Sequence, residues 1–245
     1  MKTGGREERQ GNRMRILLVD DDVEAIANIR GIMSRCGHSC VALRTGAGLL
    51  AELRRETFDL LLLDWNLPDI SGLDLLRSIR AMPMTIGIIM LTNRSGEEDI
   101  ARALHAGADD YIVKPESEPI IVARVSAALR RTVPAQPLAR LTRFGPYEFD
   151  RLTEVVRIDG EVVPLSAKEY ALALLFFENA HRAMSRGYIL EALWHSVADL
   201  PTRTLDMHVS RVRSKLRLRP ENGYRIVALS GYGYRMECFP IESAA

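Results

Sequence analysis

The sequence predicts an α/β domain with a doubly wound, five-stranded parallel sheet, followed by a smaller α+β domain. Over residues 14–131, five short apolar runs alternate with five segments of helical periodicity, as in a parallel sheet covered by helices. Residues 132–141 hold two prolines and no periodicity, which is typical of an interdomain linker. Residues 142–240 then combine short strands with three helical segments.

The composition indicates a folded protein with room for two ordinary domains. The chain has 245 residues, 47% hydrophobic and 27% charged, with a formal net charge of only +1. We find no apolar run long enough to span a bilayer and no signal-peptide pattern, so we expect a cytoplasmic protein without membrane contact. In that setting the three cysteines are expected to be reduced thiols.

The first domain is expected to follow a polar, flexible extension at residues 1–13. Continuous apolar runs such as Phe58–Leu63 are typical of strands buried on both faces of a sheet. We expect strands at residues 15–19, 39–43, 58–63, 86–91 and 111–113. We expect helices at residues 23–36, 48–56, 72–81, 97–105 and 118–131, because apolar residues there recur at helical spacing.

The second domain is expected to open with strands and to end before a short tail at residues 241–245. Asp159 and Gly160 signal a hairpin turn. Ser166 and Glu169 form a capping-box pattern at the start of a helix. We expect strands at residues 144–149, 154–158, 161–165, 225–229 and 234–238, and helices at residues 170–177, 186–194 and 203–216.

Polar residues follow the predicted strands of the first domain. Asp20 and Asp21 follow the first strand, Asp64 the third, Thr92 the fourth and Lys114 the fifth. Right-handed crossovers place these strand ends at one edge of the sheet, so the side chains should converge. Carboxylates at that distance repel unless a cation lies between them, and Mg²⁺ prefers oxygen ligands. A carboxylate beside a metal, an ammonium and a hydroxyl predicts phosphoryl transfer, whereas each acid alone would read as a helix cap or surface charge.

The predicted helix at residues 203–216 is basic. Residues 203–225 carry seven arginines and lysines against two acids. Apolar residues at helical spacing define a core-facing side and leave a polar side that contains Met207, Ser210, Arg211 and Ser214. An arginine-bearing helix followed by a hairpin is typical of a winged helix-turn-helix in a DNA major groove. From these residues alone, a solvated basic face is an equal alternative.

Five motifs in the first domain resemble those of response-regulator receiver domains in two-component signalling. They are Val19–Asp22, Asp64–Pro68, Met90–Thr92, Gly107–Tyr111 and Val113–Pro115. The resemblance implies a flavodoxin-like receiver that accepts a phosphoryl group on Asp64 from the phosphohistidine of a sensor histidine kinase.

The same resemblance implies a role for each matching residue. Asp21, Asp64 and the backbone carbonyl of Asn66 would ligate Mg²⁺, with Asp20 acting mainly through a bound water. Thr92 and Lys114 would hold phosphate oxygens. Thr92 and Tyr111 would form a switch pair, in which the tyrosine ring rotates as the threonine moves toward the phosphoryl group.

Four positions depart from the receiver pattern. Asn93 stands where the family usually has a small residue, and Glu116 stands where it usually has an aromatic one. In the dimer face of the fourth and fifth helices, a basic and an acidic residue commonly pair at positions that are Ile100 and Ile120 here. We therefore expect a homodimer face with more apolar contact and fewer ion pairs, for which the remaining charged candidates are Asp109, Asp110, Arg124 and Arg131.

Residues 203–216, together with Gly231–Arg235, resemble the winged-helix output domain of OmpR/PhoB-type transcription regulators. The resemblance implies that the third helix of this domain reads the major groove of double-stranded DNA. Ser230 stands where the family often has an arginine, and Tyr232 is a candidate to pack on the sugar–phosphate backbone. The candidate base contacts are Met207, Ser210 and Arg211, and the candidate backbone contacts are Trp194, Arg203, Thr204 and Arg213.

Together these patterns predict a phosphorylation-regulated, DNA-binding transcription regulator that is not an enzyme. We expect it to bind tandem half-sites as a homodimer, with RNA polymerase as a further partner. An atypical regulator that binds DNA without phosphorylation is an alternative prompted by Asn93 and Glu116. An aspartate-nucleophile phosphatase is a weaker one, because such enzymes usually place a second acid where this chain has Asn66.

Overall fold

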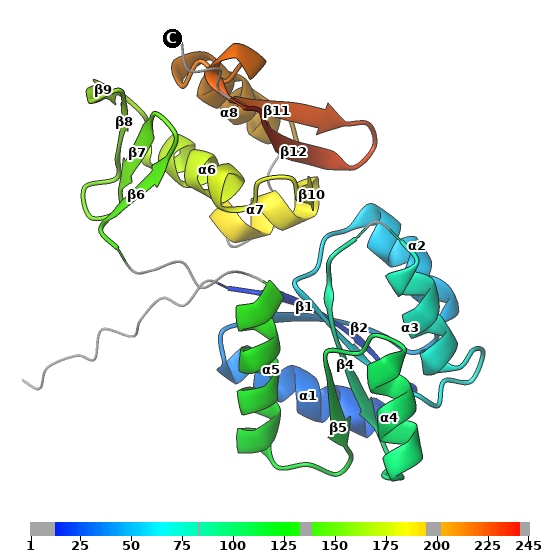
Figure 1. The fold of residues 1–245 in the computed structure, drawn as a ribbon. Helices are drawn as coiled ribbons and strands as arrows, with labels where there is room; N and C mark the ends of the chain where they lie inside the picture. Colours follow the sequence, from blue (N-terminus) through cyan, green and yellow to red (C-terminus); the bar gives the residue numbers. More distant parts are fainter. Residues whose placement is uncertain (1–12, 83, 133–138, 195–201, 241–245) are drawn as a thin grey trace, which may run out of the picture. The chain divides into compact units, whose positions relative to one another are not determined.

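The computed structural model describes residues 13–82, 84–132, 139–194 and 202–240. The chain divides into two compact units, one built mainly from residues before 136 and one mainly from residues after it (Figure 1). The predicted tail, the centre of the predicted linker and all but Arg13 of the predicted extension lie outside the described residues. No helix in the described ranges is long and apolar enough to cross a membrane.

The first unit contains a five-stranded sheet in the order β2-β1-β3-β4-β5, with every neighbouring pair parallel. This confirms the predicted doubly wound sheet. The four leucines of β3 are fully buried, as a strand covered on both faces requires. The strands are β1 (Arg15–Val19), β2 (Ser39–Leu43), β3 (Leu60–Leu63), β4 (Gly87–Thr92) and β5 (Asp110–Val113).

Five helices cover the two faces of this sheet (Figure 1). They are α1 (Val23–Arg35), α2 (Ala47–Arg55), α3 (Gly72–Arg80), α4 (Glu97–His105) and α5 (Glu118–Thr132). Successive strand residues face opposite sides, so Leu17 packs in the core under α2, α3 and α4, and Leu18 packs in the core under α1 and α5. The carboxylate of Asp22 caps α1 by accepting bonds from two backbone N–H groups.

The second unit contains two antiparallel sheets and three helices. The sheet β6-β7-β8-β9 consists of β6 (Leu141–Phe144), β7 (Tyr147–Asp150), β8 (Val155–Ile158) and β9 (Glu161–Val163). The sheet β10-β12-β11 consists of β10 (Ala183–Ser185), β11 (Tyr224–Leu229) and β12 (Gly233–Cys238). The helices are α6 (Ala167–Glu178), α7 (Arg186–Trp194) and α8 (Thr202–Lys215), and a 3-10 turn, η1 (Pro220–Asn222), follows α8.

Two features of the second unit differ from the sequence prediction. The strand predicted at residues 144–149 is two strands, because Gly145 adopts a φ of 56° and Pro146 follows it in a tight turn. β6 then begins at Leu141, inside the segment predicted as a linker, where it pairs with Asp150 of β7. β10 was not predicted, since three residues are too few to show a periodicity.

The helices of the second unit pack around one apolar core. The predicted inward face of α8 is confirmed, since Leu205, Val209 and Val212 are all fully buried. The predicted capping box is also confirmed: Ser166 accepts a bond from the N–H of Glu169, whose carboxylate accepts one from the N–H of Ser166. α8 therefore lies with one face against the core and the opposite face on the surface.

Candidate functional site

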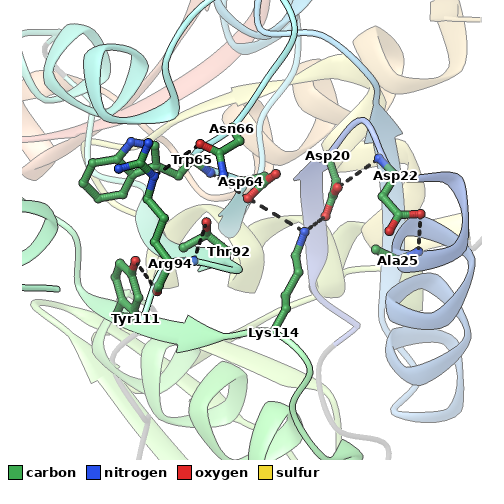
Figure 2. Close-up of polar contacts among 10 residues, drawn as sticks. All are labelled: Asp20, Asp22, Ala25, Asp64, Trp65, Asn66, Thr92, Arg94, Tyr111 and Lys114. Carbon is green, nitrogen blue, oxygen red and sulfur yellow. Dashed lines mark hydrogen bonds and ion pairs between the residues drawn. The ribbon is translucent and has the colours of Figure 1, made fainter. Parts of the chain in front are cut away.

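Three carboxylates meet at the carboxyl edge of the parallel sheet in the first unit (Figure 2). Asp20 and Asp21 follow β1, and Asp64 follows the adjacent strand β3. One oxygen of each carboxylate lies within 4.8 Å of one oxygen of the others. Asp20 and Asp64 are buried, whereas Asp21 is exposed. The cluster is therefore buried on the side of Asp20 and Asp64 and open to solvent on the side of Asp21. It offers the oxygen ligands that a divalent cation requires.

Lys114 places an ammonium group against the buried carboxylates. Its Nζ lies 2.5 Å from Oδ2 of Asp20 and 3.8 Å from Oδ1 of Asp64. Its backbone N–H donates to the carbonyl oxygen of Thr92, 2.8 Å away, so the two strand ends are held side by side. The predicted convergence of these residues is thus observed, with Lys114 closer to Asp20 than to Asp64.

The surroundings of Asp64 oppose ionisation of its carboxyl group. Burial raises the pKa of Asp64, the nearby charge of Lys114 lowers it, and the like charge of Asp20 raises it again. The N–H of Trp65 donates to Oδ1 at 2.8 Å, and this bond and the side chain of Thr92 both lower the pKa of Asp64. The net effect is a raised pKa, so the ionised form is stabilised by any additional cation that enters the open side.

The predicted switch residues meet through the loop that follows β4. Thr92 is fully buried, and its Oγ1 accepts a 3.4 Å bond from the N–H of Arg94. Tyr111 is also buried, and its hydroxyl donates to the carbonyl oxygen of Arg94 at 2.9 Å. Asn66 is exposed, and its Oδ1 accepts a 3.3 Å bond from Nε of Arg94.

The residues predicted for the dimer face lie on or beside α4, β5 and α5. Ile120 is 42% exposed, whereas Ile100 packs partly against the core. The charged candidates have partners within the same chain: Arg124 pairs with Asp110 at 2.8 Å, and Arg80 pairs with Asp109 at 2.8 Å. Arg131 donates to the backbone oxygen of Asp109.

Some of the predicted DNA-contacting residues are exposed, and others are partly buried within the second unit. Met207 is 52% exposed, and Ser210 and Arg211 are exposed on the same side of α8. Arg213 is partly buried and donates from Nε to the carbonyl oxygen of Ile226 at 3.1 Å. Thr204 is partly buried near the start of α8. The side chain of Arg203 lies outside the described residues.

The remaining candidates flank α8. The ring of Trp194, at the end of α7, meets the ring of His208 in α8 edge-on, with 5.5 Å between the ring centres. Nζ of Lys168 lies 5.4 Å from the centre of the Trp194 ring. Tyr232 lies in the turn between β11 and β12, after Gly231 with a φ of 69°. The structure thus places a basic helix, an aromatic residue and a hairpin in one unit.

Comparison with known proteins decides the family. Residues 16–126 match the response regulator receiver domain family, and residues 160–236 match the family described as transcriptional regulatory protein, C terminal. The chain is 33% identical over 225 residues to sensory transduction protein RegX3 of Mycolicibacterium smegmatis, covering 91% of this chain and 98% of that protein. It is 34% identical over 221 residues to the phosphate regulon regulator PhoB of Pseudomonas aeruginosa, covering 89% and 96%. The chain is a response regulator of the OmpR/PhoB family.

A solved structure also resembles this OmpR/PhoB-family chain. The response regulator DrrB of Thermotoga maritima aligns with a TM-score of 0.45 and 29% identity, over 92% of this chain and 99% of that one. As a family member, the protein is a phosphorylation-regulated, DNA-binding transcription regulator and not an enzyme. Its partners are DNA and a cognate histidine kinase.

Two features of this response regulator escaped the sequence reasoning. Arg94 contacts both predicted switch residues through its backbone, and its guanidinium contacts Asn66 and Asp99. A basic residue two positions after Thr92 was a signal for the guanidinium contacts alone. Asp206 of α8 is held by NH1 of Arg186 at 2.6 Å and by the hydroxyl of Tyr234. A lone acid within the basic helix was the signal there, but its partners lie on α7 and β12.

Proposed function

We propose that Asp64 is the phosphoacceptor and that Asp20, Asp21, Asp64 and the backbone carbonyl of Asn66 hold Mg²⁺. The observation that carries this proposal is the meeting of three carboxylates within 4.8 Å, beside one ammonium group, at the edge of the sheet. Bound Mg²⁺ would supply positive charge for the carboxylates and for the transferred phosphoryl oxygens.

The side chains around Asp64 support a direct transfer. A carboxylate oxygen of Asp64 would form a bond to phosphorus as the phosphorus–nitrogen bond of the kinase phosphohistidine breaks. Lys114 already lies 3.8 Å from Asp64 and would pair with one phosphoryl oxygen. The hydroxyl of Thr92, at the end of the neighbouring strand β4, would donate to another.

The output of the switch is proposed to be a homodimer through α4, β5 and α5. Arg94 bonds to both Thr92 and Tyr111, so a shift of Thr92 toward a phosphoryl oxygen would alter the loop that leads into α4. Arg124 and Asp110 pair within the chain, which leaves the exposed Ile120 as an apolar contact. We expect dimerisation to depend little on salt, since few ion pairs would cross the interface.

The dimer would place α8 of each chain in the major groove of a tandem half-site, about one helical turn apart. Exposed Met207, Ser210 and Arg211 support base contacts, with backbone contacts from Trp194, Arg203, Thr204, Arg213 and Tyr232. A chromosomal partner supports a cytoplasmic location, and contact with RNA polymerase belongs to the same proposal.

The test compares the full chain with Asp64→Asn. Both proteins are incubated with acetyl phosphate and Mg²⁺, weighed intact, and titrated against oligonucleotides selected for binding. The parent should gain the mass of one phosphoryl group and bind the oligonucleotides more tightly. The variant should show no added mass and no change in affinity. Asp74→Asn is the matched control, because Asp74 is an exposed acid of α3. Equal response of parent and Asp64→Asn would refute the proposal.

A further inference from the structure

One arginine joins the phosphoacceptor loop to α4. Arg94 lies between β4 and α4, and 42% of its side chain is exposed. Its guanidinium carbon lies 5.0 Å from the ring centre of Trp65, the residue directly after Asp64. Its Nε lies 3.3 Å from Oδ1 of Asn66, and its NH1 lies 3.4 Å from Oδ2 of Asp99 in α4. Figure 2 shows this side chain on one side of Asp64 and Lys114 on the other.

The hydrogen bonds of this guanidinium are long. Bonds of 3.3 and 3.4 Å exceed the usual range for an N–H donor and an oxygen acceptor. A phosphoryl group on an aspartate would bring about two negative charges and three strong acceptor oxygens. A planar guanidinium prefers such a group to a neutral amide oxygen, because it can donate two parallel, charge-assisted bonds.

We propose that Arg94 is a phosphoryl-contacting residue: on phosphorylation of Asp64, its guanidinium leaves Asn66 and Asp99 and binds a phosphoryl oxygen on the open side of the site. This inference rests on the proposed function, since it requires Asp64 to be the phosphoacceptor. Lys114 holds the buried side of the group, and Arg94 holds the side that faces solvent.

The movement has two structural consequences. Trp65 is only 4% exposed and is flanked by two guanidinium groups, Arg94 at 5.0 Å and Arg102 at 5.8 Å. Departure of Arg94 uncovers one side of the indole. Asp99 keeps Arg102 at 3.5 Å but loses its ion pair with Arg94, so α4 loses one of its two contacts with the loops at the site and keeps the contact of Arg102 with Trp65. Phosphorylation is thereby transmitted to α4 by a second route besides Thr92.

Trp65 is a built-in reporter of this movement. The chain has two tryptophans, so Trp194→Phe in the full chain leaves Trp65 as the sole emitter for measurements on the first unit. Beryllofluoride with Mg²⁺ serves as the probe, because it mimics a phosphoryl group on a carboxylate. Its addition should shift Trp65 emission to longer wavelength as the indole gains contact with water.

Three substitutions in this background test the contact. Half-saturation is measured by titration calorimetry, which does not depend on the emission of Trp65. Arg94→Gln should raise the half-saturating beryllofluoride concentration about tenfold, the loss expected for one charge-assisted hydrogen bond, and should abolish the emission shift. Arg94→Lys keeps the positive charge but lacks the planar guanidinium group, and it should raise the half-saturating beryllofluoride concentration about threefold. Arg102→Gln is the matched control, since Arg102 shares the contacts with Trp65 and Asp99 and should leave half-saturation unchanged.

The outcomes separate this inference from the function on which it rests. The role of Arg94 would be overturned if Arg94→Gln were half-saturated at the same beryllofluoride concentration as the parent. It would also be overturned if Arg102→Gln lost as much affinity for beryllofluoride as Arg94→Gln, because the effect would then come from packing on Trp65. Absence of added phosphoryl mass on the parent after acetyl phosphate would overturn the proposed function, and the role of Arg94 with it. Parental phosphorylation with an unaltered Arg94→Gln response would overturn only the role of Arg94.

Discussion

Replacing Asp64 by asparagine should stabilise the first unit when divalent cations are absent. Carboxylate oxygens lie within 4.8 Å of one another, and at an effective dielectric constant of about 20 each like pair costs about 3.5 kcal/mol. Lys114 at 3.8 Å offsets about 4.4 kcal/mol on the same scale. Two like pairs exceed this one attraction, and because solvent screens the exposed Asp21, we expect a net gain of about 1–2 kcal/mol in unfolding free energy.

The gain should depend on pH and on Mg²⁺. Burial raises the pKa of Asp64, so the folded state is penalised once pH rises through that raised value. The difference in unfolding free energy between Asp64→Asn and the parent should therefore increase with rising pH and disappear in acid, where the parental carboxyl is protonated. Mg²⁺ should reverse the order, because a cation that binds only the folded parental cluster stabilises the parent more than the variant.

Urea unfolding of the full chain, in chelator and in Mg²⁺, checks this reasoning. Trp65 emission in the Trp194→Phe background reports the first unit. Asp74→Asn controls for the loss of a negative charge, because Asp74 lies in an exposed ion pair with Arg77. A lower urea midpoint for Asp64→Asn in chelator, or an equal rise of both midpoints with Mg²⁺, would refute the electrostatic account.

Three further predictions concern the second unit. Glu169→Gln should lower the free energy of unfolding by about 1–2 kcal/mol, measured by thermal unfolding. Burial opposes ionisation of Glu169, but hydrogen bonds from Lys215 and Ser166 hold the pKa of its carboxyl group below the usual value. The difference between variant and parent should therefore vanish as the pH falls through the range in which carboxyl groups titrate. Tyr147→Phe should cost about 1–2 kcal/mol in urea unfolding, because the buried carbonyl of Leu216 loses its donor. Arg211→Ala should cost about 1–3 kcal/mol in DNA affinity and relax specificity at one base pair, measured by anisotropy; equal loss on all sequences would indicate a phosphate contact.

The sequence alone determined the order of elements in the first unit and the location of the carboxylate cluster. Apolar periodicity and the β3 leucine run are local properties of the chain. Because parallel strands joined by right-handed crossovers end at one edge, the positions of Asp20 and Asp64 after β1 and β3 also followed without coordinates. The receiver and DNA-binding functions were predictable from the same motifs.

Tertiary structure decided which side chains touch. Arg94 and Asn66 are 28 positions apart, and their contact depends on how two loops pack over the sheet edge. Asp206 meets Arg186 and Tyr234 only because α7, α8 and β12 share one core. β10 exists as a strand through its pairing with β12 rather than through any pattern of its own. Such contacts depend on side-chain rotamers and loop packing, which the order of apolar and polar residues does not specify.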